Sequence, residues 1–187
     1  NSSSFLICHS GSSSRGKTFS SLIAISIHGN ISEDGLFQTF KGTDVAVEKS
    51  CESFCDLPVL FDEISNRNDW FIKNQIYTIA SGKGYMRGKV EDGEVKLRET
   101  PSWRTVAMLT GERDITSAIS NAGEQVRTIQ IHRGMKQFDK VFIQNQQEKL
   151  SRNNGHIFEL FLEKLNQNRD RIKQLHTHYL EKFKNQV

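Results

Sequence analysis

Long hydrophobic stretches are missing from this sequence of 187 residues. A membrane-spanning helix needs about 20 consecutive apolar residues, and no run approaches that length. The longest candidate, residues 19–28, is short and contains serines, so we expect a buried helix there. Internal repeats and low-complexity tracts are also absent, and hydrophobic residues make up 36% and charged residues 25% of the chain. This is the composition of an ordinary globular protein, and we expect no contact with a membrane.

Cysteine is scarce, with only Cys8, Cys51 and Cys55. An odd number without zinc-type pairing argues against both a disulfide framework and a zinc site, and predicts a reduced, cytoplasmic protein. Cys51 and Cys55 lie four residues apart in a helical pattern, which favours one shared apolar face. The chain shows no signal peptide and begins at Asn1 without a methionine, almost directly on an apolar strand. We therefore expect a fragment of a longer protein whose N-terminal part is missing.

Neither sign of charge dominates. Lysine and arginine total 25 and aspartate and glutamate 22, a formal net charge of +3. Such a balance neither demands nor excludes a nucleic-acid partner. Any basic contact must therefore depend on where individual lysines and arginines are placed.

Short apolar segments typical of strands alternate with segments of helical periodicity. The expected strands are residues 4–9, 36–40, 58–61, 103–109 and 128–132. The expected helices are residues 19–27, 44–55, 70–81 and 115–121, with Asp44 and Asp69 as caps of the second and third. This alternation predicts an α/β fold, a three-layer sandwich whose mainly parallel central sheet is covered on both faces. Trp70 and Trp103 are expected in its core.

Two further features depart from this alternation. Glu91, Asp92 and Gly93 have the chemistry of a hairpin turn, so a β-hairpin is expected as an insertion at about residues 85–99. From Lys140 onward the sequence is polar and helical. We place a boundary at residues 134–139, which separates a core of residues 1–133 from a C-terminal helical segment of residues 134–187.

Residues 11–18 match the phosphate-binding pattern G-x-x-x-x-G-K-[ST] without a substitution, between a strand and a helix as the pattern requires. Its glycines allow backbone N–H groups to turn inward around phosphate oxygens, and the following helix directs its N-terminal dipole at the same anion. Lys17 supplies a cation for the outer phosphates, and the Thr18 hydroxyl can bind Mg²⁺. The alternative is a serine-rich loop that matches by chance. The expected nucleotide-binding residues are Gly11, Ser12, Ser13, Ser14, Arg15, Gly16, Lys17, Thr18 and Phe19.

An apolar strand ends on the adjacent carboxylates of Asp62 and Glu63. Because side chains alternate along a strand, the two cannot share one role. Asp62 suits the carboxylate that holds Mg²⁺ through water, and Glu63 suits the base that orients an attacking water. The alternative is a pair of charges that merely ends the strand. No guanine-reading N-K-x-D element is found, so ATP is favoured over GTP.

Two more residues are expected to act in catalysis. Thr110 ends a core strand, where a polar side chain can touch the γ-phosphate or the attacking water; an ordinary strand-terminating threonine is the alternative. Arg127 precedes the last core strand, where it can stabilise transition-state charge on a neighbouring subunit's nucleotide, unless it is a surface arginine. Arg104 and Arg113 are rivals for that role. Glu112 belongs either to the site or to a salt bridge.

Basic residues gather on the expected hairpin, namely Lys83, Arg87, Lys89 and Lys96. An inserted hairpin projects from the core, and in a ring it can reach a central channel and follow the phosphate backbone of DNA. Acidic residues of the same segment balance these charges, so a solvated hairpin is the alternative.

Several short runs, in their order, resemble one family of ATPases from phages, plasmids and integrative elements, which is similar to replicative helicases of the mini-chromosome-maintenance type in the AAA+ class. The runs are L-P-V-L-F-D-E-I, I-A-S-G-K-G-Y-M-R-G, W-R-T-V-A-M-L-T-G-E, N-A-G-E-Q-V-R and N-N-G-H-I-F, and the resemblance covers most of residues 5–165. It implies a P-loop NTPase fold of the AAA+ or RecA-like kind, a homohexameric ring and ATP hydrolysis at subunit interfaces. By position it assigns the acidic pair to Asp62 and Glu63, the γ-phosphate sensor to Thr110 and the trans-acting finger to Arg127.

Together with the resemblance, these residues predict an ATPase that uses ATP and Mg²⁺ to unwind DNA or to translocate along it, with single-stranded DNA as its partner, in the replication of a mobile element. A switch or remodeller that acts on a protein partner, gripped by the hairpin, is the alternative. The two hypotheses differ in whether DNA stimulates ATP turnover.

Overall fold

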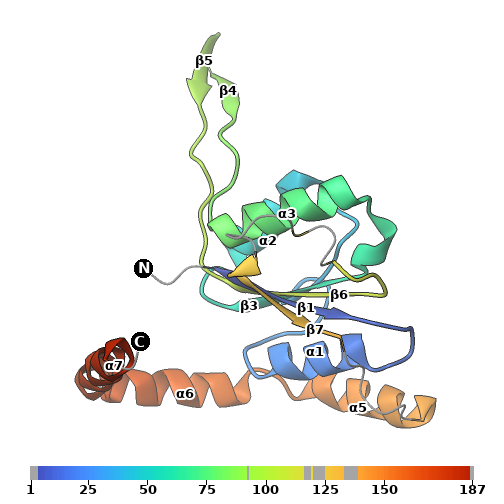
Figure 1. Ribbon diagram of the computed structural model, residues 1–187, viewed down its shortest axis with the longest axis vertical. Helices are drawn as coiled ribbons and strands as arrows, with labels where there is room; N and C mark the ends of the chain where they lie inside the picture. Colours follow the sequence, from blue (N-terminus) through green and yellow to red (C-terminus); the bar gives the residue numbers. More distant parts are fainter. Residues whose placement is uncertain (1–3, 92, 116–118, 120–124, 133–138, 186–187) are drawn as a thin grey trace.

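The computed structural model describes residues 4–91, 93–115, 119, 125–132 and 139–185. A sheet of five strands lies at its centre (Figure 1), formed by β1 (Phe5–Ser10), β2 (Phe37–Thr39), β3 (Pro58–Asp62), β6 (Val106–Gly111) and β7 (Thr128–Ile131). The strands lie in the order β2-β3-β6-β1-β7, and every neighbouring pair is parallel. The expected α/β fold with a mainly parallel sheet is therefore confirmed.

Parallel pairing brings the carboxyl ends of the strands to one edge of the sheet. Ser10 at the end of β1 is level with Gly111 at the end of β6, and Thr39 at the end of β2 is level with Asp62 at the end of β3. The segments that follow these strands therefore begin close together. Open parallel sheets bind their ligands at this edge.

Helices cover both faces of the sheet (Figure 1). α2 (Asp44–Ser53) and α3 (Asp69–Ser81) lie on one face, and α1 (Lys17–Ser26) and α5 (Lys140–Arg152) lie on the other. The main core, between the sheet and α2 and α3, includes Leu6, Phe61, Ile76, Ile79 and Leu109. A smaller cluster of Leu22, Ile25, Ile31, Leu36 and Leu60 lies on the α1 side. Because both faces are covered, the inner strands β1, β3 and β6 are mostly apolar until their last residues.

The two helices on the first face are capped one residue earlier than expected. The side chains of Thr43 and Asn68 each accept a hydrogen bond from the backbone N–H three residues further on, at 3.4 and 2.8 Å. They therefore cap α2 and α3, and the expectation that Asp44 and Asp69 are the caps is wrong. Both aspartates lie in the first helical turn, where a negative charge complements the helix dipole.

An antiparallel hairpin of β4 (Gly88–Glu91) and β5 (Glu94–Leu97) projects away from the layers of the core (Figure 1). Its position between α3 and β6 agrees with the expected insertion. The paired strands are shorter than the sequence predicted, because pairing begins only at Gly88 and ends at Leu97. The segments between these strands and the core run side by side as a stem.

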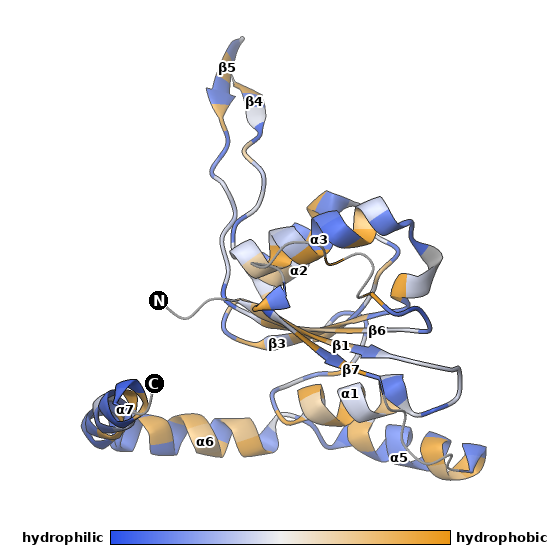
Figure 2. Cartoon of the chain, viewed as in Figure 1, coloured by the Kyte–Doolittle hydropathy of each residue, from blue (hydrophilic) through white to orange (hydrophobic). Residues whose placement is uncertain are grey.

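Two C-terminal helices, α6 (His156–Gln167) and α7 (Arg169–Lys184), extend from the core as an arm (Figure 1). No residue of either helix is buried, and Figure 2 shows polar and apolar residues on both. The expected helix at residues 115–121 and the expected boundary at residues 134–139 fall largely outside the described residues, so both stay predictions.

Several expectations about single residues can be compared with the structure. Cys8, Cys51 and Cys55 are free thiols, and burial raises the pKa of Cys8 and Cys51 to about 12. Cys55 is exposed and lies beyond the end of α2, so it does not share an apolar helix face with Cys51 as expected. Trp103 is 4% exposed, as predicted, but Trp70 is 71% exposed, and its expected place in the core is wrong. Of the helices that the structure describes, none has both the length and the apolar character of a membrane span.

Candidate functional site

The loop between β1 and α1 has a backbone shape that suits an anion. Gly11, Ser14 and Gly16 have positive φ angles of 141°, 60° and 75°. Gly16 is the N-cap of α1, where no side chain caps the first N–H groups and the first turn holds no acidic residue. The open N–H groups and the helix dipole leave a partial positive charge at this point. A phosphate is the kind of group that binds there.

Lys17 lies inside this loop. Its ammonium donates hydrogen bonds to the carbonyl oxygens of Gly11 (2.9 Å) and Ser12 (2.8 Å), and the residue is only 8% exposed. Within the described part of the chain, no carboxylate forms an ion pair with it. A nearly buried cation without an anionic partner is costly. The loop therefore combines a charge and a backbone that both favour a bound anion.

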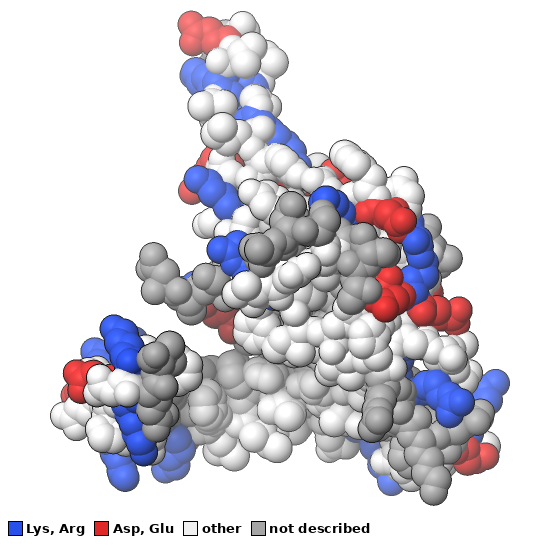
Figure 3. All heavy atoms as spheres, in the orientation of Figure 1, with Lys and Arg blue, Asp and Glu red and all other residues white. Residues whose placement is uncertain are grey.

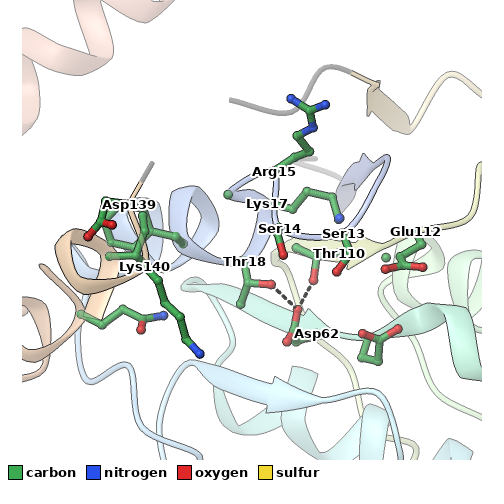
Figure 4. A pocket seen from close by; sticks show the side chains of 16 residues that line it. Ser13, Ser14, Arg15, Lys17, Thr18, Asp62, Thr110, Glu112, Asp139 and Lys140 are labelled. Carbon is green, nitrogen blue, oxygen red and sulfur yellow. Dashed lines mark hydrogen bonds between the residues drawn. The ribbon is translucent and has the colours of Figure 1, made fainter. Parts of the chain in front are cut away.

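Asp62 is the point where three elements meet (Figure 4). The Thr18 hydroxyl at the start of α1 donates to Asp62 Oδ1 at 2.9 Å, and the Thr110 hydroxyl of β6 donates to the same oxygen. Thr110 is 1% exposed, so its hydroxyl is held in this position by the surrounding sheet. Three residues that are far apart in the sequence thus bring their oxygen atoms together beside the loop.

These oxygens suit a magnesium ion. A hydroxyl at the start of the helix after such a loop and a carboxylate at a strand end are the protein groups that hold Mg²⁺ in nucleotide sites. The Thr18 and Asp62 oxygens lie 2.9 Å apart, so both are placed beside the same position. No group of three or more His, Cys, Asp or Glu side chains in the described residues could hold a metal ion by itself. The arrangement fits a magnesium ion that takes most of its ligands from water and phosphate, as is usual for nucleotide sites.

Two further carboxylates, Glu63 and Glu112, line the same cavity. Glu63 has a left-handed backbone conformation (φ 66°) and is exposed, so the chain turns directly after Asp62 and separates the two neighbouring carboxylates. The Glu112 N–H donates to the Ser65 hydroxyl at 2.6 Å, which joins the turn after β6 to the turn after β3. Glu112 was expected either in the site or in a salt bridge. It lines the cavity and forms no ion pair with any described residue, so the structure favours the role in the site.

The cavity has a volume of about 880 Å³. The loop and the ends of β3 and β6 form one part of its wall, and of the expected nucleotide-binding residues those from Ser13 to Phe19 line it. α5 and its cap form the remaining wall, which the sequence does not predict, through Asp139, Lys140, Ile143 and Gln147. No local motif marks these residues. Only the packing of α5 against α1 brings them to the loop.

The candidate arginines lie outside this cavity. The Arg127 carbonyl accepts a hydrogen bond from the Leu6 N–H at 2.8 Å, near the start of β1. The six residues of β1 span about 20 Å, so Arg127 lies at the opposite edge of the sheet from the loop. Arg104 and Arg113 each form an ion pair with an aspartate instead. Of the three, only Arg127 is without an ion pair among the described residues.

The four basic residues of the hairpin segment do not form one group. Arg87 donates two hydrogen bonds to the Glu48 carboxylate of α2, at 2.5 and 2.8 Å, and this contact raises the pKa of the Arg87 guanidinium. Lys83 lies at the base of the stem, whereas Lys89 and Lys96 are opposite each other on β4 and β5. Figure 3 shows basic side chains along the hairpin and acidic ones at its end. Arg87 therefore anchors the stem to the core.

Comparisons with known proteins bear on this site. The model of a family described as "Domain of unknown function (DUF927)" matches residues 1–100. No curated protein matches the chain. Sixteen chains of solved structures match it, among them one described as "SCCmec type IV Cch - active helicase", with a TM-score of 0.75 and 26% sequence identity. The match covers 92% of this chain and 31% of that one, so the chain spans less than a third of the neighbour's length.

The description of this neighbour agrees with the expected resemblance to helicases, at the level of helicases in general. The structural neighbour shares the architecture of this chain over 92% of its length. Neither description mentions the mini-chromosome-maintenance type, a ring or a nucleotide.

Proposed function

The chain belongs to the family described as a domain of unknown function, DUF927, and from this premise we propose that it is the ATPase module of a helicase-like motor. The observation that carries the proposal is that the Thr18 and Thr110 hydroxyls both donate a hydrogen bond to one oxygen of Asp62. This cluster lies beside the uncapped start of α1 and the buried Lys17. A structural neighbour described as an active helicase supports it.

The proposed chemistry is hydrolysis of ATP to ADP and phosphate. The loop N–H groups and Lys17 bind the phosphates, and Thr18 and Asp62 hold Mg²⁺, which when bound neutralises charge on the phosphate oxygens. Glu63 accepts a proton from the attacking water, and Thr110 hydrogen-bonds the γ-phosphate or that water. The exposed position of Glu63 on the cavity wall supports its role as a base.

The finer part of the proposal concerns assembly and partner. We propose a homohexameric ring of the AAA+, mini-chromosome-maintenance type, in which Arg127 acts on the nucleotide of the next subunit. Its position at the far edge of the sheet from its own loop supports action between subunits. The partner is single-stranded DNA of a mobile element in the cytoplasm, contacted by Lys83, Lys89 and Lys96, with Arg87 anchoring the hairpin that carries them.

The first test replaces Glu63 by glutamine, which keeps the size of the side chain but cannot accept a proton. ATP hydrolysis should fall about a hundredfold or more, while MgATP still binds, because the phosphate contacts are intact. Glu33→Gln, at an exposed glutamate outside the cavity, is the matched control and should hydrolyse ATP at the wild-type rate. Equal hydrolysis by Glu63→Gln and wild type would exclude Glu63 as the base.

A mixing experiment tests Arg127. Arg127→Ala subunits retain a complete cavity, and Glu63→Gln subunits retain the arginine, so each variant should be inactive alone. In a ring with one repeated head-to-tail interface, random mixing in equal amounts should restore about a quarter of the active interfaces. No recovery on mixing, from variants that assemble normally, would contradict action between subunits.

A protein remodeller is the second candidate, and the hairpin supplies the observation that favours it. Val90, Val95 and Leu97 are 76%, 81% and 74% exposed and fall on one face of the ribbon, an apolar surface that suits a protein partner. The motor predicts that single-stranded DNA increases ATP turnover. Turnover that is indifferent to DNA would favour the remodeller.

A further inference from the structure

The cavity extends well beyond the groups that are expected to bind phosphate. In Figure 4, Asp62 and Glu112 lie on one side of Thr18, and Asp139 and Lys140 of α5 lie on the other. The first side carries the acidic pair and Thr110, where the terminal phosphate would be hydrolysed. The α5 side, with Ile143 and Gln147, therefore remains for the nucleoside.

α5 is held firmly against the core, so its cavity wall has a defined position. Asp139 caps it by accepting hydrogen bonds from two backbone N–H groups, at 2.9 and 3.1 Å. Leu150 packs against the cluster that contains Leu22 and Ile25. Beyond the helix, the Gly155 N–H donates to the carbonyl of Ser26 at the end of α1, at 2.8 Å. A capped helix whose C-terminal end is held against the core forms a wall that can select between ligands by shape and hydrogen bonding.

Gln147 is a polar residue on the partly buried face of α5. Ile143, Gln147 and Leu150 are all partly buried and have the spacing of one helix face. The Gln147 amide has no hydrogen-bond partner among the described residues, although it lines the cavity. Its two polar atoms are not among the buried atoms without a partner, so both are open to the cavity, and a ligand can pair with both of them.

We propose that Gln147 selects adenine over guanine in this cavity, an inference that rests on the proposed ATPase function. A glutamine amide presents one donor and one acceptor, which match the N7 acceptor and the N6 amino donor of adenine. Guanine presents two acceptors on the same edge, N7 and O6, so one of the two hydrogen bonds is replaced by repulsion between oxygens. Ile143 supplies apolar surface for the base.

The test measures affinities for ATP, GTP and inorganic tripolyphosphate by calorimetry in the presence of Mg²⁺, with the whole chain. The wild type should prefer ATP to GTP by about tenfold, the scale of one two-bond base contact. Gln147→Ala should remove the preference through weaker ATP binding. Gln147→Lys should favour GTP, because lysine pairs with the two guanine acceptors. The added charge should change the affinities for ATP and GTP by the same factor, so the ratio of these two affinities is free of this general effect.

Gln144 provides the control, since it is an exposed glutamine of the same helix that does not line the cavity. Gln144→Lys should keep the wild-type ratio. Tripolyphosphate has no base, so its affinity for Gln147→Ala should equal that for the wild type. An unchanged ratio in Gln147→Ala, with tripolyphosphate still bound, would overturn the role of Gln147 and leave the proposed function standing. If the wild type binds neither ATP nor tripolyphosphate, both proposals fail.

Discussion

Gly111 shows how tightly single residues are constrained beside the cavity. A Cβ atom at this position would lie 2.6 Å from Ile64 Cγ1 and 2.9 Å from Ser65 Oγ. Both neighbours belong to the turn that follows Asp62 and Glu63. The small residue therefore lets the end of β6 approach the end of β3, and this approach allows Thr110 to reach Asp62.

We expect Gly111→Ala to separate these two strand ends. The added methyl group has no room, so the free energy of unfolding should fall by about 1–3 kcal/mol, the usual cost of overpacking. Nucleotide affinity should fall as well. Chemical denaturation measures the first effect and calorimetry with MgATP the second. Gly88→Ala is the control, because the nearest atom to its Cβ would be 3.4 Å away, and a stability of Gly111→Ala equal to that of this control would refute the packing argument.

At the scale of elements, the hairpin stem is attached to α2 by an ion pair. Glu48 is 1% exposed, and besides the two hydrogen bonds from Arg87 it accepts one from the Tyr85 N–H at 3.4 Å. The Tyr85 hydroxyl in turn donates to Asn74 of α3 at 2.7 Å. The stem is thus held to both helices of one layer, although the paired strands themselves project from the core.

Arg87→Ala should therefore destabilise the protein rather than merely change its surface. It leaves the buried Glu48 carboxylate without its cation, which costs about 3 kcal/mol. Lys83→Ala, at an exposed lysine of the same segment, should change stability by less than about 0.5 kcal/mol. Thermal unfolding followed by circular dichroism compares the two variants. Equal melting temperatures would show that the ion pair does not anchor the stem.

The exposed apolar surface of the whole molecule lies mainly on its two projections. Apart from the hairpin, it gathers on the helical arm, where Tyr179 and Phe183 of α7 are 61% and 68% exposed. The core carries the cavity, and α5 joins it through contacts to α1. In α6, Phe158 packs on His28 at the end of α1, whereas no residue of α7 is buried, so α7 adds little to the stability of the core.

Removal of α7 by truncation after Asn168 should leave the melting temperature within about 2 °C of the full chain, because no residue of that helix is buried. Truncation after His132 also removes α5, uncovers the cluster under α1 and should lower the melting temperature by at least about 5 °C. The same measurement serves both variants. A large loss of stability on removing α7 alone would mean that the arm packs against the core in solution.

Local sequence patterns determined the strands, most helices, the hairpin and the position of the phosphate-binding pattern. These features depend on neighbouring residues: periodicity, turn-forming residues and an eight-residue motif. The ends of parallel strands necessarily meet at one edge, so the closeness of Thr18, Asp62 and Thr110 also followed from chain order. The sequence places the two caps one residue too late, because Thr43 and Asp44, like Asn68 and Asp69, are adjacent residues that can both cap a helix.

Only the tertiary structure decided which distant residues complete the site and which are occupied elsewhere. The α5 wall with Gln147, the pairing of Arg87 with Glu48 and the exposure of Trp70 all depend on how separate elements pack. No local pattern encodes the α5 wall or the Arg87–Glu48 pair, because each brings together residues that are far apart along the chain. The exposure of Trp70 cannot be predicted locally either, because it depends on where the other elements pack.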